Sequence, residues 1–129
     1  GFFVEPTVVR VRSHTDRVCQ EEVFGPFVTV STFDSDDEAL EIANSTDYAL
    51  GGGLWTQNLA RAHRIAGVLR SGMVWVNSYK RVHPGSPFGG FGLSGYGREM
   101  GFEALHDYTE PKSVWVNHSA TIPAWYPRP

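Results

Sequence analysis

The sequence has a single cysteine among its 129 residues, so no disulfide can form within the chain. A lone thiol is usual in a reducing compartment, and we therefore expect a cytoplasmic protein. No apolar run approaches the roughly 20 residues that a helix needs to cross a bilayer, and no secretory signal is visible. We expect no membrane partner.

Positive charge is also scarce. The chain carries 11 lysines and arginines against 14 aspartates and glutamates, a net charge of −3, and its arginines are scattered. Nucleic-acid binding needs a basic patch, so we expect no nucleic-acid partner. The histidines lack metal-ligand spacing, so we expect no metal site, and His63, His83 and His106 are interpreted as surface or packing residues.

Apolar residues are plentiful at 41%, and they include four tryptophans, five tyrosines and eight phenylalanines. This content is too high for a disordered chain. The sequence opens on Gly1-Phe2-Phe3 without an initiator methionine and ends on a tail rich in tryptophan and proline. We expect more protein at both ends.

Strands are predicted where β-branched and aromatic residues cluster or alternate with polar ones. These segments are residues 6–11, 27–33, 54–56, 73–77 and 113–116. Three consecutive glycines, Gly51–Gly53, argue against a strand that begins before Leu54. We expect the strand over 73–77 to be buried on both faces.

Capping residues predict the helices. Ser35 followed by Glu38 is a capping box, and Asn58 precedes a run of apolar residues at helical spacing. A shorter helix is predicted over 98–108. The resulting β-α-β-α-β order indicates an α/β fold, with a mainly parallel sheet and helical crossovers.

Residues 78–97 lack periodicity, and five glycines fall between Gly89 and Gly97. Glycine lets the backbone approach a ligand or another segment closely. The segment is not a phosphate loop, because the glycine spacing and the lysine of that motif are missing. These residues indicate either a structured binding loop or a tight joint.

Two carboxylates, Glu21 and Glu22, precede Phe24 and a Gly25-Pro26 turn. Consecutive side chains of an extended segment point in opposite directions, so one glutamate can reach into a cleft while the other faces solvent. A carboxylate in a cleft needs donors such as ribose hydroxyls. Residue types alone favour an acidic surface turn.

In combination and order, these segments resemble the C-terminal part of the catalytic domain of the NAD(P)-dependent aldehyde dehydrogenase superfamily. The resemblance runs from Gly1 to about Val116. The segments that carry it are Gly1–Thr7, Glu21–Pro26, Ala43–Tyr48, Trp55-Thr56, Val74–Asn77, Ser86–Gly90, Ser94–Glu99 and Tyr108–Lys112.

The resemblance implies three segments: residues 1–111 as part of the catalytic domain, 112–117 as an oligomerisation strand and 118–129 as a C-terminal tail. In the family this strand joins a sheet formed with another subunit, which satisfies its open edge. A homodimer or homotetramer is therefore implied for the full-length protein.

The resemblance also implies site residues. Glu22 corresponds to the carboxylate that binds the nicotinamide ribose of NAD or NADP, and Phe24 to the aromatic residue beside the nicotinamide, with core packing as the alternative role of Phe24. Ser78, Val82 and Phe88 correspond to the substrate tunnel. Val82 stands where many relatives place an aromatic residue.

The neighbouring Lys80 and Arg81 leave two interpretations open. A cationic neighbourhood favours acidic or polar aldehydes, whereas charged side chains at a tunnel mouth also form a solvated rim. The residue types favour the rim. The aldehyde itself is not specified by this sequence.

Family members oxidise an aldehyde to a carboxylic acid through a cysteine thiohemiacetal, with a glutamate as general base. Neither motif is present here, and Cys19 does not match the nucleophile. We therefore expect a part of an aldehyde dehydrogenase that is inactive alone and requires the missing N-terminal part of the enzyme. Two alternatives remain: a non-catalytic interaction module that assembles with a full-length dehydrogenase, and an independent enzyme that uses Cys19.

Overall fold

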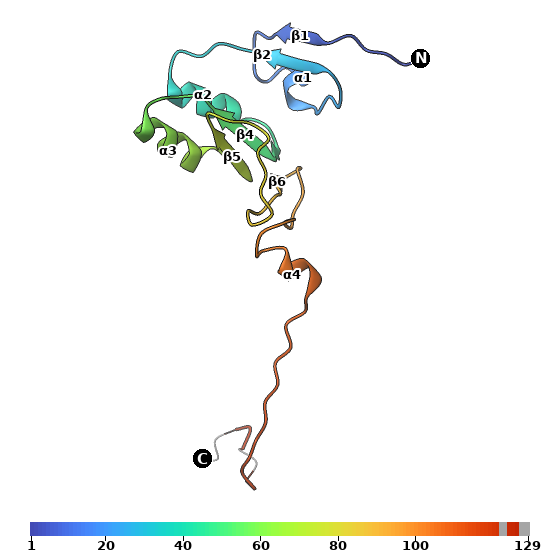
Figure 1. Cartoon of the computed structure of the whole chain (residues 1–129), viewed down its shortest axis with the longest axis vertical. Helices are drawn as coiled ribbons and strands as arrows, with labels where there is room; N and C mark the ends of the chain where they lie inside the picture. Colours follow the sequence, from blue (N-terminus) through green and yellow to red (C-terminus); the bar gives the residue numbers. More distant parts are fainter. Residues whose placement is uncertain (122–123, 127–129) are drawn as a thin grey trace.

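The computed structural model describes residues 1–121 and 124–126. Its elements are β1 Thr7–Arg10, α1 Arg17–Gln20, β2 Phe27–Val30, α2 Asp36–Ala43, β3 Tyr48–Ala49, β4 Gly51–Leu54, α3 Leu59–Val68, β5 Met73–Val76, β6 Phe91–Gly92 and α4 Leu105–Tyr108. Figure 1 shows β1, α1 and β2 as one group, α2 and α3 beside β4 and β5 as a second, and an extended chain that leaves α4.

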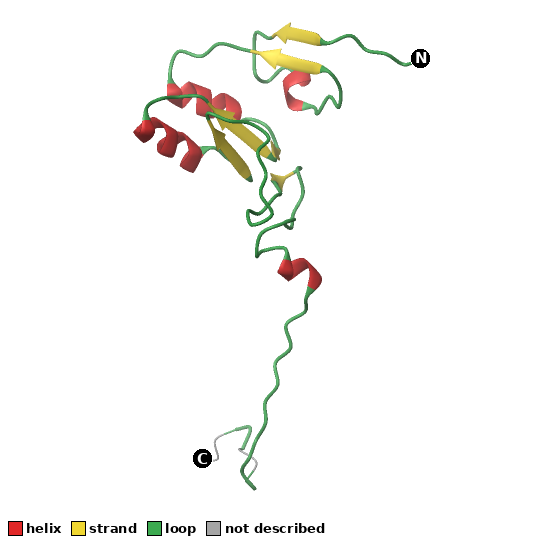
Figure 2. Ribbon diagram, viewed as in Figure 1, coloured by secondary structure: helices red, strands yellow, loops and turns green. Residues whose placement is uncertain are grey.

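The strands form three separate two-stranded sheets within the described part of the chain. The β1–β2 pair is parallel and is joined through α1, and the β4–β5 pair is parallel and is joined through α3. The β3–β6 pair is antiparallel. Figure 2 shows the two parallel pairs and their helices. The predicted α/β fold with parallel strands and helical crossovers is confirmed, but its strands do not form one continuous sheet here.

Strand β4 begins at Gly51, so the expectation that the glycines lie outside the strand was wrong. A Cβ atom added at Gly51 would lie 2.8 Å from the Trp75 ring, and one added at Gly52 would lie 2.5 Å from Cδ2 of Leu69. Both faces of the strand are therefore crowded by neighbouring side chains. Glycine is used here for close approach, at the expense of strand propensity.

The predicted helix caps are confirmed. Ser35 Oγ accepts a hydrogen bond from the Glu38 N–H at 3.2 Å, and Asn58 Oδ1 accepts one from the Arg61 N–H at 3.0 Å. The return bond of the capping box differs, because the Glu38 carboxylate accepts from the backbone N–H of Asp34 at 2.7 Å.

The last helix is shorter than predicted, because α4 covers only Leu105–Tyr108. Three residues before it have positive φ angles: Gly97 at 80°, Met100 at 59° and Gly101 at 62°. This left-handed backbone cannot continue a right-handed helix. The predicted helix over 98–108 is therefore confirmed only in its last four residues.

Few apolar side chains are buried. Among the described residues, only Leu40, Ala49 and Ala62 are buried hydrophobic residues. Strand β5, predicted to be buried on both faces, is half-buried over its first three residues and exposed at Val76. Val28 on the β1–β2 sheet is 51% exposed. Exposed apolar surface of this extent is typical of contact surfaces that another polypeptide covers.

The predicted strand over 113–116 is not formed within this chain: the segment is exposed, and Figure 1 shows the chain extended after α4. Trp115 is 93% exposed. A strand needs a partner for its backbone groups, and none of the described residues supplies one.

The tail from 118 to 129 lies partly outside the described residues. No helix that the structure describes is long and apolar enough to cross a bilayer.

Candidate functional site

Predicted site residues line two hollows of the structure. The larger has a volume of about 1060 Å³ and is lined by residues of α2, α3, β3 and β4, together with Cys19, Glu21 and Glu22. The smaller has a volume of about 200 Å³ and lies between β5 and the segment 81–88. We call them the larger cavity and the smaller cavity.

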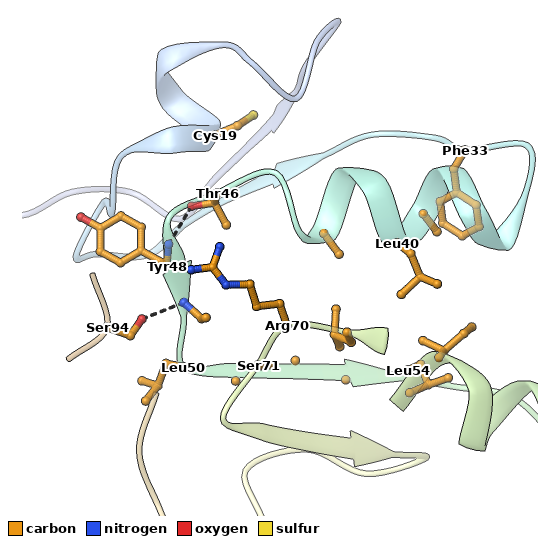
Figure 3. Close-up of a pocket in the computed structure, with 18 of the residues that line it drawn as sticks. Cys19, Phe33, Leu40, Thr46, Tyr48, Leu50, Leu54, Arg70, Ser71 and Ser94 are labelled. Carbon is orange, nitrogen blue, oxygen red and sulfur yellow. Dashed lines mark hydrogen bonds between the residues drawn. The ribbon is translucent and has the colours of Figure 1, made fainter. Parts of the chain in front are cut away.

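The larger cavity has an apolar end and a polar end. Figure 3 shows Phe33, Leu40 and Leu54 gathered at one end, with Tyr48 and Ser94 at the other. Ser94 Oγ accepts a hydrogen bond from the backbone N–H of the buried Ala49 at 2.9 Å. This bond ties the glycine-rich segment to β3.

Glu22 lines the larger cavity and is exposed. Its neighbour Glu21 also lines this cavity, and the opposite directions of the two carboxylates stay a prediction. Glu21 Oε1 forms an ion pair with Nε of Arg17, four residues earlier, at 2.6 Å. This pair holds Glu21 against α1. Glu22 makes no hydrogen bond or ion pair with any residue that the structure describes, so its carboxylate is available to a ligand.

Phe24 lines neither cavity, and its side chain is 96% exposed. The backbone turns beside it, because the Gly25 N–H donates to the carbonyl of Val23 at 2.9 Å and the Phe27 N–H donates to the carbonyl of Gly25 at 2.8 Å. Phe24 therefore projects away from the contacts that this chain makes. Its role beside a nicotinamide remains a prediction.

The smaller cavity brings together two of the three predicted substrate residues. Val82 and Phe88 both line it, whereas Ser78 is half-buried and lines neither cavity. Met73 and Trp75 of β5 form the opposite wall. The cavity is therefore a small hollow with both polar and apolar lining, built by one strand and the loop that follows it.

Trp75 also holds that loop, and the sequence interpretation missed this role. Its Nε1–H donates to the carbonyl of Arg81 at 2.8 Å. Its ring contacts the ring of Tyr79 edge to face, with centroids 5.4 Å apart. The signal was the alternation within β5, which places Met73 and Trp75 on the same face, next to the space that Gly51 leaves.

The other end of the loop is fixed by backbone contacts and one arginine. Phe88 and Glu99 exchange two backbone hydrogen bonds of 2.7 and 2.8 Å. Arg98 Nη1 donates to the carbonyls of Gly90 at 2.8 Å and Gly97 at 2.6 Å, and its guanidinium lies 4.7 Å from the centre of the Phe91 ring. Of the two interpretations of the glycine-rich segment, these contacts favour the tight joint.

An ion-pair cluster links the start of α2 to α3. Asp36 Oδ2 lies 2.9 Å from Arg61 Nε and 2.7 Å from Arg64 Nη2, and Asp37 lies 2.9 Å from Arg64 Nη1. The hydrogen bond from Arg61 is the main reason why the pKa of Asp36 is lowered. The hydrogen bond to Asp37 is the main reason why the pKa of Arg64 is raised. The cluster joins the helices that border the larger cavity.

Cys19 is half-buried and lines the larger cavity. Its Sγ lies 3.8 Å from the carbonyl oxygen of Ser13, which is its only hydrogen-bond partner among the described residues. Nucleophilic thiols need a base or a positive group nearby. No histidine that the structure describes is bonded to this thiol, so the arrangement does not activate it.

Comparison with known proteins shows where this chain belongs. The sequence profile described as "Aldehyde dehydrogenase family" matches residues 1–114. DhaS from Bacillus subtilis, which carries the name of an aldehyde dehydrogenase, is 50% identical over 117 residues that cover 91% of this chain and 24% of that protein.

Two solved structures are also similar. PnpE from Pseudomonas sp. WBC-3 is 69% identical, with a TM-score of 0.89 over 98% of this chain and 26% of its own, and it has also been solved with nicotinamide adenine dinucleotide. A betaine aldehyde dehydrogenase variant from Staphylococcus aureus, solved with NAD+, is 38% identical, with a TM-score of 0.91 over 99% of this chain and 26% of its own.

This chain spans about a quarter of the length of these relatives. The match covers the smaller cavity, the larger cavity and the glycine-rich joint between them, since all three lie within residues 1–114. The chain belongs to the aldehyde dehydrogenase family.

Proposed function

We propose that these residues form part of an NAD(P)-dependent aldehyde dehydrogenase and supply nicotinamide-ribose and substrate contacts. The overall reaction converts an aldehyde, the oxidised nicotinamide cofactor and water into a carboxylic acid, the reduced cofactor and a proton. The observation that carries the proposal is that Val82 and Phe88, two of the three predicted substrate residues, line one cavity in a chain of this family. Activity, substrate and partners of the whole protein remain part of the proposal.

The cofactor would accept the hydride that leaves the substrate. The residue of this chain that fits its ribose is Glu22, because a carboxylate accepts hydrogen bonds from two neighbouring hydroxyls. Glu22 has no protein partner among the described residues, whereas Glu21 is paired with Arg17. The relatives solved with NAD support NAD as the cofactor, with NADP as the other candidate.

The nucleophile would come from the part of a family-length protein that this chain does not span. The only thiol, Cys19, contacts a carbonyl and no activating base among the described residues. The exposed apolar side chains, including Val28 and Trp115, are consistent with a surface that further polypeptide covers. We therefore propose that the 129 residues do not turn over aldehyde alone.

A second candidate is a non-catalytic interaction module. The observation that favours it is the exposed, extended segment 113–116, which has a free edge on both sides. In this reading residues 112–117 add as a strand to another subunit, while 1–111 and 118–129 form the catalytic-domain part and the tail. A cytoplasmic homodimer or homotetramer of the full-length enzyme would use the same strand.

The test uses a hybrid of family length, in which these 129 residues replace the matching quarter of PnpE. NADH formation is followed by absorbance with a panel of aldehydes, for the hybrid and for the chain alone. We expect turnover by the hybrid and none by the chain above a buffer blank. In the hybrid, Glu22→Gln should raise the KM for the cofactor about tenfold, as for loss of charged hydrogen bonds.

Glu21→Gln is the matched control, since Glu21 is engaged with Arg17, and it should leave the KM for the cofactor within about twofold of the parent. An inactive hybrid would contradict the dehydrogenase proposal. If the inactive chain nevertheless co-assembled with intact PnpE, the interaction module would be the better description. Turnover by the chain alone that Cys19→Ala abolishes would instead establish Cys19 as a nucleophile.

A further inference from the structure

We infer that the smaller cavity selects an aldehyde that also carries a carboxylate, with Arg81 and His83 as the residues that recognise the anion. The inference rests on the proposed function and names the substrate class of that site. Both residues line the cavity together with Val82 and Phe88. The sequence alone favoured a solvated rim for Arg81 and a surface or packing role for His83.

The lining of the smaller cavity contains basic side chains and no acidic ones. Its polar side chains are Arg81, His83 and Ser86, and it contains no acidic residue. The ion pairs that the structure describes involve Arg17, Arg61 and Arg64, so no described carboxylate neutralises Arg81. A guanidinium without a protein partner binds a carboxylate through two parallel hydrogen bonds.

His83 is oriented to donate a hydrogen bond. Its Nδ1 accepts from the backbone N–H of Gly85 at 3.0 Å. Because Nδ1 accepts, the proton of the neutral ring must lie on Nε2. The imidazole therefore presents an Nε2–H donor in its neutral form. A carboxylate can use this donor without a change in protonation.

The backbone of this segment is held at fixed points. The carbonyl of Arg81 accepts from the Trp75 indole at 2.8 Å, and the carbonyl of His83 accepts from the Ser86 N–H at 2.9 Å. The stems of both side chains thus start from constrained positions beside the cavity. Constrained donors lose less conformational entropy when a ligand binds.

The remaining walls suit a short carbon chain. Met73, Trp75, Val82 and Phe88 are apolar or aromatic and surround the polar groups. The volume of about 200 Å³ is smaller than the roughly 300 to 1,000 Å³ of sites for drug-sized ligands. A short apolar chain that ends in an anion fits a small hollow that combines these apolar side chains with two donors.

Lys80 gives a matched control for this argument. It carries the same charge as Arg81 and is its neighbour in sequence, but it lines neither cavity. Its Nζ instead lies 5.7 Å from the centre of the Tyr79 ring. Removing the charge of Lys80 changes the field around the loop and leaves the lining of the cavity intact.

The experiment compares succinic semialdehyde with butanal, a neutral aldehyde of the same chain length, in the PnpE hybrid. We expect kcat/KM to be higher for succinic semialdehyde. Arg81→Gln should lower that value about tenfold, mainly through KM, and leave butanal within about twofold. His83→Gln should give a smaller loss of the same kind, Arg81→Lys should restore part of the activity, and Lys80→Gln should change neither substrate.

Three outcomes would overturn the inference. A hybrid that is active but prefers butanal removes the substrate class and leaves the proposed function standing. Equal losses for Lys80→Gln and Arg81→Gln indicate a general field effect, and equal losses for both aldehydes indicate a structural role of Arg81. A hybrid that oxidises no aldehyde at all overturns the proposed function and this inference together.

Discussion

The side-chain amide of Asn77 is hydrogen-bonded to both backbone groups of Thr56. Its Oδ1 accepts from the Thr56 N–H at 2.8 Å, and its Nδ2 donates to the Thr56 carbonyl at 2.8 Å. Asn77 itself has a φ angle of 54°, a left-handed conformation that asparagine tolerates better than most residues. One residue thus follows the end of β5, turns the chain toward the substrate loop and fastens it to Thr56, two residues after the end of β4.

Replacing Asn77 by alanine should loosen this junction. Alanine removes both hydrogen bonds and is strained at the same φ angle, for a combined local cost of about 2 kcal/mol. We expect amides of residues 54–56 and 76–78 to exchange at least about tenfold faster in the hybrid, measured by hydrogen exchange with mass spectrometry.

Asn77→Gly separates the two contributions, because glycine loses the hydrogen bonds without the strain. Its exchange rates should fall between those of the parent and Asn77→Ala. Parental exchange in both variants would show that the amide contacts do not hold the junction.

Residues whose role is local were the easiest to predict. Ser35 and Asn58 cap their helices through N–H groups three residues away, and such short-range contacts can be predicted from the sequence. Gly51 could not be interpreted in this way. Its requirement comes from the Trp75 ring, which lies across the sheet and 24 positions later, and only the fold brings the two together.

The crowding at Gly52 predicts a compensated pair of substitutions. Gly52→Ala places a Cβ 2.5 Å from Leu69 Cδ2, and such overpacking destabilises by about 1 to 3 kcal/mol. Leu69→Ala in the same chain should recover part of that loss, because it removes the atom that clashes. The thermal midpoints of the hybrid and its single and double variants measure this coupling.

Gly67 provides the contrasting substitution. It lies within α3, and an added Cβ would meet no heavy atom within 4 Å. Gly67→Ala should therefore raise the thermal midpoint, since alanine favours helix by about 1 kcal/mol over glycine.

For the pair at Gly52, additive effects of Gly52→Ala and Leu69→Ala on the thermal midpoint would contradict the proposed clash.

The residues of the candidate site also differ in whether their predicted partners lie within this chain. Val82 and Phe88, six positions apart, meet in the smaller cavity of this chain. Glu22 and Phe24 do not meet a common cavity, because Phe24 is exposed and its predicted contact would be a cofactor. Residues whose partner lies outside the chain cannot be placed by contacts within it.

The Asp36 cluster predicts an acid-dependent change in stability. The pKa of Asp36 is lowered below its ordinary value of 3.8, chiefly by the hydrogen bond from Arg61. Its stabilising contribution is therefore present above pH 3.8 and is lost as the pH falls through the lower, folded-state pKa. The effect should be small, because the group is exposed to solvent and salt screens it.

We expect Asp36→Asn to lower the thermal midpoint of the hybrid slightly at pH 7, and the difference from the parent to shrink as the pH falls below 3.8. Asp37→Asn should have a weaker effect, because Asp37 is 88% exposed and bonds only Arg64 in the described cluster. A difference between parent and Asp36→Asn that grows on acidification would contradict this reading of the cluster.

The indole of Trp75 predicts a second kind of kinetic change, distinct from that of Arg81. Trp75→Phe keeps an aromatic ring in the smaller cavity but removes the N–H that donates to the Arg81 carbonyl. Because this bond holds the part of the loop at Arg81 beside the cavity, we expect KM to rise about threefold to tenfold for charged and neutral aldehydes alike, with kcat little changed. Amides of residues 78–83 should also exchange faster.

Trp55→Phe is the control, since Trp55 lines the larger cavity and its indole has no partner among the described residues. Unchanged KM and unchanged exchange in Trp75→Phe would show that ring packing alone holds the loop, and a loss confined to the charged aldehyde would assign Trp75 to the recognition of the anion.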